Sequence, residues 1–120
     1  MKVAISSQGN SLKSKEDPRF GRSSWFAVID KETGKFYTID NDQNLSSAQG
    51  AGIQAAEKVS REGVEAVITG HCGPKAFRVL KAAGITVYLV SDGTVEEIMA
   101  KFKLGELVKA DTPDVEGHWI

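Results

Sequence analysis

The sequence contains a single cysteine, Cys72, in 120 residues, and this scarcity limits the chemistry available to it. One thiol cannot form an intramolecular disulfide, so packing alone must hold the fold together. A structural zinc site or an iron-sulfur cluster bound only by protein ligands needs four donors, mostly cysteines. Any metal centre here must therefore be labile, shared between subunits, or held largely by groups other than thiolates.

An excess of one charge and long apolar runs are also missing. The formal net charge is −1, which argues against a general affinity for nucleic acid or for anionic membranes. No apolar run approaches the roughly 20 residues of a membrane span, and the apolar start of the chain is too short for a signal peptide. We therefore expect a cytoplasmic protein with no nucleic-acid or membrane partner.

The sequence does contain apolar strands that alternate with amphipathic helices. Strands are predicted over 2–6, 24–30, 35–40, 66–69 and 85–90, and helices over 48–63, 74–83 and 95–103. Thr94 and Glu97 are predicted to form a capping box at the start of the last helix. The second and third strands form an antiparallel hairpin, whereas the helix–strand alternation that follows requires parallel crossovers. We predict one α/β domain over 1–120, a three-layer α/β/α sandwich with a five-stranded mixed sheet, in which 105–120 form a tail. The nearly continuous apolar strand 85–90 predicts burial on both faces.

The most informative stretch is 64–76, in which an apolar strand is followed by His71, Cys72 and a Gly-Pro pair that opens a helix. The first turn of a helix presents free N–H groups and the positive end of its dipole. A thiol in such a place has a lowered pKa and more thiolate, the form that binds metal. We therefore expect the sulfur of Cys72 to protrude and to bind a metal or cluster, with His71 as the second ligand.

Four glycines near predicted strand and helix ends leave room for close approach to the backbone. They are Gly50, Gly52, Gly70 and Gly73. At the first two, contact with an anion and tight packing of the helix on the sheet explain the pattern equally well. Ligands of open α/β sheets lie beyond the carboxyl ends of the parallel strands. The loops at 7–22, 41–52, 70–74 and 91–94 are therefore expected to share one rim.

The hairpin-plus-crossover order also occurs in ribonuclease H-like nucleases, which hold two metals on carboxylates of the first strand and its neighbours. Here the first strand carries no acid, and Asp30 and Asp40 are interpreted as turn formers at the ends of the hairpin strands. Burial of Phe20, the aromatic residue of the loop at 7–22, would indicate that this loop is ordered. We do not expect nuclease activity.

Other interpretations of the candidate ligands stay open. Cys72 is alternatively a small, half-buried residue that fills a loop, a redox-sensing thiol, or a nucleophile with His71 as its base, although no acid is placed to orient that base. His71 is alternatively a solvated polar residue. His118 lies near Asp114 and Glu116 and is either a solvated tail residue or a further ligand.

Several of these segments together resemble the dinitrogenase iron-molybdenum cofactor biosynthesis family. They are 17–22 (D-P-R-F-G-R), Trp25-Phe26, 50–56 (G-A-G-I-Q-A-A), 66–77 and 80–88. The resemblance covers roughly residues 1–105 and implies a ribonuclease H-like fold without the nuclease site. It also implies a non-enzymatic protein that binds, carries or scaffolds an iron-sulfur or iron-molybdenum-sulfur cluster during assembly. The implied partners are the proteins that assemble or receive the cluster.

Such binding has a physical basis in the backbone of the helix starts. An anionic cluster would rest on N–H groups at the helix starts near Gly50 and Pro74, with Cys72 and His71 holding it weakly. A homodimer that paired two rims would direct two thiolates toward one cluster. The alternative function is a regulatory module that binds a small-molecule anion or a nucleotide, without any cluster.

Overall fold

A computed structural model describes residues 1–41 and 50–113 of the chain. The elements are β1 (Lys2–Ser7), the short 3-10 helix η1 (Phe20–Arg22), β2 (Trp25–Asp30), β3 (Phe36–Asp40), α2 (Ala51–Arg61), β4 (Ala66–Thr69), α3 (Pro74–Ala82), β5 (Thr86–Leu89), α4 (Val95–Lys103) and β6 (Val108–Lys109). The strands form one mixed sheet in the order β3-β2-β1-β4-β5-β6. Strands β1, β4 and β5 are parallel, and the other pairings are antiparallel.

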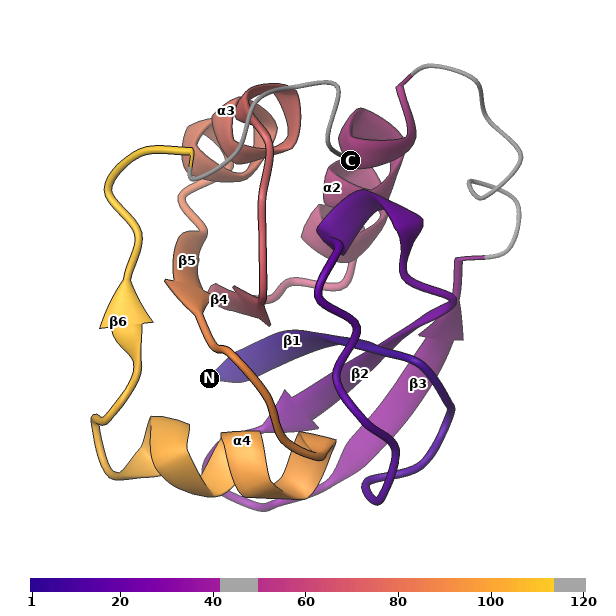
Figure 1. The fold of residues 1–120 in the computed structure, drawn as a ribbon, viewed down its shortest axis with the longest axis vertical. Coiled ribbons are helices and arrows are strands. Elements are labelled where there is room, and N and C mark those ends of the chain that lie inside the picture. Colours follow the sequence, from indigo (N-terminus) through magenta and orange to yellow (C-terminus); the bar gives the residue numbers. More distant parts are fainter. Residues whose placement is uncertain (42–49, 114–120) are drawn as a thin grey trace.

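Helices cover both faces of this sheet, which gives three layers (Figure 1). Successive residues of β1 divide between the two faces because side chains alternate along a strand. Ala4 belongs to a core cluster with residues of α2 and α3, whereas Val3 and Ile5 belong to a cluster with residues of α4. The predicted α/β/α layering is therefore confirmed. Among the described residues, no helix has the length and apolarity needed to cross a membrane.

The sheet has six strands, so the prediction of five was wrong. The additional strand, β6, pairs Val108 with Leu89 and Lys109 with Tyr88, within the segment predicted to be a tail. Two exposed residues give no periodic pattern, which is why the sequence did not reveal this strand. Strand β5 is also less buried than expected, since only Val87 within it is fully buried. The ribonuclease H-like relationship stays a prediction.

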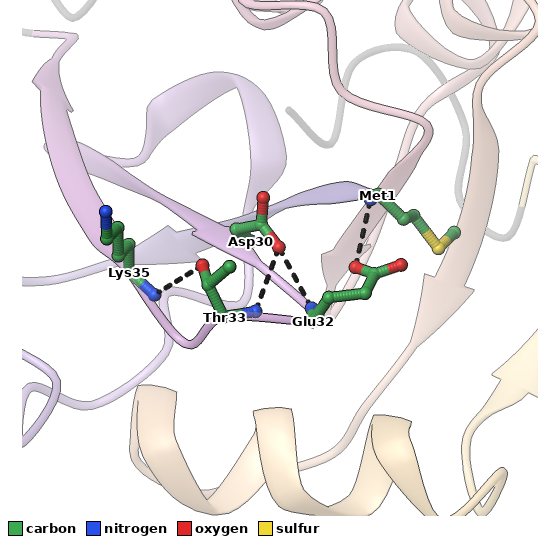
Figure 2. A network of polar contacts seen from close by, with 5 residues as sticks. All are labelled: Met1, Asp30, Glu32, Thr33 and Lys35. Atoms are coloured by element: carbon green, nitrogen blue, oxygen red, sulfur yellow. Dashed lines mark hydrogen bonds and ion pairs between the residues drawn. The ribbon is translucent and has the colours of Figure 1, made fainter.

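The hairpin turn between β2 and β3 is organised by Asp30 (Figure 2). Its Oδ1 accepts hydrogen bonds from the backbone N–H groups of Thr33, at 3.1 Å, and Glu32, at 2.9 Å. These bonds lower the pKa of Asp30. The amino group of Met1 pairs with Glu32 at 3.0 Å beside the same turn. Asp30 is thus a turn former, as predicted, at the opposite end of the hairpin from Asp40.

The core predicts a contrast between two leucines. Leu80 of α3 is fully buried in the core, whereas Leu104 is 73% exposed. We expect Leu80→Ala to lower the free energy of unfolding by about 2–5 kcal/mol, because the substitution leaves a cavity. The matched change Leu104→Ala should stay within about 0.5 kcal/mol of the parent. Urea denaturation measures both, and equal effects would contradict the packing described here.

Candidate functional site

Residues 8–22, which we call the strap, cross the rim of the sheet where the parallel strands end. The N–H of Asp17 donates to the carbonyl of Ser6 in β1 at 2.9 Å, and the N–H of Glu16 donates to the carbonyl of Gly93 at 3.0 Å. The strap therefore joins the end of β1 to the turn that precedes α4. The sequence predicted that four loops share a rim, and the strap connects the described ones, although residues 42–49 of the loop at 41–52 lie outside the described residues.

The second half of the strap connects the starts of α3 and α2. The N–H of Phe20 donates to the carbonyl of His71, just before α3, at 3.2 Å. One residue later, a Cβ on Gly21 would lie only 2.8 Å from the Cα of Gly52 in α2. Phe20 itself is fully buried. This burial is the sign of an ordered loop that the sequence analysis named.

The glycines predicted to admit a ligand are approached mainly by the chain itself. A Cβ on Gly70 would lie 2.7 Å from the Cα of Pro18, so the strap occupies this position, as it does at Gly52. Gly73 is buried and forms the N-cap of α3. Gly50 has φ +81° and forms the N-cap of α2, and no atom of the described residues lies within 4 Å of the position that a Cβ would take there.

Cys72 does not protrude, and this expectation was wrong. Its side chain is 1% exposed and belongs to the core cluster between the sheet and the helices α2 and α3. Phe20, Phe26 and Ala76 are in the same cluster, and the Sγ lies 3.8 Å from the carbonyl oxygen of Gly73. A small apolar side chain fits this position, which agrees with the alternative that Cys72 fills a loop.

The other candidate ligands do not assemble into a metal site. His71 is partly exposed at the rim. Across 1–41 and 50–113, no three His, Cys, Asp or Glu side chains lie together in a way that could hold a metal ion. His118 lies outside the described residues. The side-chain donors of the described residues therefore do not fit a cluster held by side-chain bonds.

The three helices that begin at the rim differ in how their first turns are satisfied. Helix α4 has the predicted capping box, in which Thr94 accepts from the N–H of Glu97 and the carboxylate of Glu97 accepts from the N–H of Thr94. Helices α2 and α3 have no side-chain cap and no acidic residue in the first turn. Their N–H groups and dipoles therefore favour negative charge beside them.

Among the described residues, the segments nearest these two helix starts are 18–22, 50–54 and 70–75, which Asp17 borders, and the charged side chains within them are cationic. These groups are Arg19, Arg22 and Lys75. Arg19 and Lys75 are exposed. In the sequence, the two arginines are recognisable only as part of the motif at 17–22. Their position was not recognisable before the strap had been placed between α2 and α3.

The other side of the strap carries a buried carboxyl that the sequence analysis missed. Glu16 is 5% exposed, and its Oε2 makes no hydrogen bond to any described residue. The pKa of Glu16 is raised to about 7, first by burial and then by the negative charges of Asp17 and Asp92, with His71 and Lys15 opposing the rise. A glutamate in a polar loop gives no sequence signal of burial.

This burial predicts a pH dependence of folding. The pKa of Glu16 is about 7 in the folded protein and about 4.5 in the unfolded chain, so the folded protein favours the protonated carboxyl. The free energy of unfolding therefore decreases as the pH rises from about 4.5 through about 7. Glu16→Gln should remove this decrease, which amounts to at most about 3 kcal/mol. Chemical denaturation at pH 5, 6, 7 and 8 measures it. Glu57→Gln, an exposed change on α2, should leave the profile as in the parent. Parallel profiles for the parent and Glu16→Gln would refute the assignment.

Comparisons with known proteins agree with the resemblance noted in the sequence. The family described as dinitrogenase iron-molybdenum cofactor matches residues 1–105. The apo form of the orange protein from Desulfovibrio gigas is 36% identical, with a TM-score of 0.92 over 95% of this chain and 96% of that one. A Thermotoga protein named as a candidate NifB is 34% identical, with a TM-score of 0.81 over 95% and 98%. An uncharacterised protein of Methanocaldococcus jannaschii is 32% identical over 111 residues, 91% of each chain. The chain belongs to the dinitrogenase iron-molybdenum cofactor family.

Proposed function

We propose that this protein binds an anionic metal–sulfur cluster of the iron-sulfur or iron-molybdenum-sulfur type and carries it during assembly, without catalysing a reaction. Family membership supports the class of cargo, because the family is described by the iron-molybdenum cofactor of dinitrogenase. The apo form of the orange protein, which is 36% identical to this chain, has the same fold.

The observation that carries the proposal is the charge around two helix starts. Helices α2 and α3 begin at the same rim without a side-chain cap, and the charged side chains within the described segments 18–22, 50–54 and 70–75 are Arg19, Arg22 and Lys75. Backbone N–H groups and the dipoles of both helices would add to the attraction. A cluster with bridging and terminal sulfides is a polyanion whose sulfurs accept hydrogen bonds, so it suits this surface.

The cluster would be held as cargo, through electrostatic attraction and hydrogen bonds. In this proposal, the partly exposed His71 would donate an N–H to a sulfide, and the exposed Arg19 and Lys75 would supply positive charge. Cys72 can participate only if the chain around it moves, because its thiol is buried. Pairing of two rims would therefore not bring two thiolates together, so the buried thiol no longer supports a homodimer. Weak, reversible attachment suits a protein that hands its cargo to an assembly or recipient protein.

Binding of tetrathiomolybdate tests the proposal. The anion has a strong visible absorbance, so titration and equilibrium dialysis can follow its binding to the protein without oxygen. We expect Arg19→Ala and Lys75→Ala each to weaken binding about threefold to tenfold, since each removes one cation. Arg61→Ala, which removes an exposed cation at the far end of α2, is the matched control. Cys72→Ala should bind as well as the parent.

A second experiment separates this function from its alternative. Anaerobic reconstitution with ferrous iron and sulfide should load the parent and Cys72→Ala equally. The alternative, a regulatory module for a small anion or nucleotide, uses the same cations but predicts that phosphate or ATP raises the Tm while tetrathiomolybdate does not bind. Negligible uptake of both metal–sulfur probes by the parent would end the cluster proposal.

A further inference from the structure

The strap is attached to the rim through backbone hydrogen bonds, a close contact at a glycine and two exposed ion pairs. The N–H groups of Glu16, Asp17 and Phe20 donate to the turn before α4, to β1 and to the loop before α3, and carbonyls of the strap accept from the first turn of α4. Pro18 lies against Gly70 so closely that even a Cβ would not fit. The ion pairs, Lys13 with Glu96 and Lys15 with Asp92, are exposed and therefore contribute little to holding the strap closed.

The strap also contributes to the cover over Cys72. Phe20 is fully buried, packs its ring against that of Phe26 at a centroid distance of 5.2 Å, and belongs to the same core cluster as the thiol. Its N–H binds the carbonyl of His71, the residue before Cys72. Lifting the strap would withdraw Phe20 from this cluster and open a path toward the sulfur.

Within the strap, Glu16 is the group that is least well accommodated. It is 5% exposed, and its Oε2 is buried without a hydrogen bond to the described residues. Ionised groups that face it are Lys15 and Asp17 on the strap, Asp92 in the turn before α4, and His71 when protonated. A negative charge on Glu16 is poorly solvated while the strap is closed, and water would solvate it once the strap lifts.

We propose that the strap is a lid over the carboxyl ends of β1 and β4, that Cys72 becomes reachable only when this lid lifts, and that the buried carboxyl of Glu16 makes lifting easier. This proposal rests on the proposed function only in that the lid would control access to the same rim. Its test uses no cargo, so each of the two proposals can fail while the other survives.

Labelling of Cys72 with a thiol reagent measures the lid. Reaction with 5,5′-dithiobis(2-nitrobenzoate) at pH 8 should be much slower in the folded parent than in urea, because the thiol reacts only in open molecules. Glu16→Gln, which keeps the shape and removes the charge, should slow labelling about tenfold or more. Glu57→Gln should label at the parental rate. Gly70→Ala should label faster, because the new methyl group collides with Pro18.

Hydrogen exchange gives a readout that does not depend on the thiol. The amides of Asp17 and Phe20 should exchange at least about tenfold faster than those of Ile5 and Val67, which would show that the strap opens without global unfolding. Equal exchange at the four amides would overturn the lid. Labelling as fast in the folded parent as in urea would also overturn it, as would an unchanged rate in Glu16→Gln. If Gly70→Ala does not fold, Glu16→Gln and the exchange rates still decide.

Discussion

The parallel run of β1, β4 and β5 determines where every other part of this molecule lies. A helix that connects or follows parallel strands must begin where a strand ends, so α2, α3 and α4 all start at the same rim. Three positive dipole ends are thereby collected on one edge of the sheet. The chain neutralises one of them locally, through Thr94 and Glu97 at the start of α4, and leaves the other two without a side-chain cap.

The strap gives this rim two chemically different sides. Near α2 and α3 it carries Arg19 and Arg22, whereas near α4 it carries the buried Glu16 and two lysines, Lys13 and Lys15, that pair with Glu96 and Asp92. One short segment thus supplies cations suited to an anion and also a carboxyl that is poorly solvated while the strap is closed. Attraction of cargo and ease of opening are consequently properties of the same fifteen-residue stretch, 8–22, and a substitution in it can alter one through the other.

The sequence predicted correctly those features that depend on residues close to one another along the chain. The capping box of α4, the turn formed by Asp30 and the bounds of β4 agree with the structure because each depends on residues close in sequence. Side-chain direction at a junction is different. Cys72 follows a strand and precedes a helix, and whether its thiol points outward depends on packing with the distant Phe20.

The same limit explains the other differences. Close approach at Gly70 and Gly52 was anticipated, but the approaching group is the strap, which no local pattern could place there. Glu16 has the composition of a solvated loop residue and is buried through contacts formed with the turn at Gly93. The basic side of the rim exists only because residues separated by about fifty positions meet, so the sequence alone could not show it.

Strand β6 affects how molecules of this protein can associate through their sheets. By pairing with β5, these two residues block backbone pairing between β5 and another chain on that side of the sheet. The opposite border is formed by β3, where Phe36 and Tyr37 are each about 40% exposed. There Lys58 Nζ donates to the carbonyl of Asp40 and shortens the stretch of free backbone. Intermolecular sheet extension is therefore expected to favour β3, which is the longer of the two edge strands.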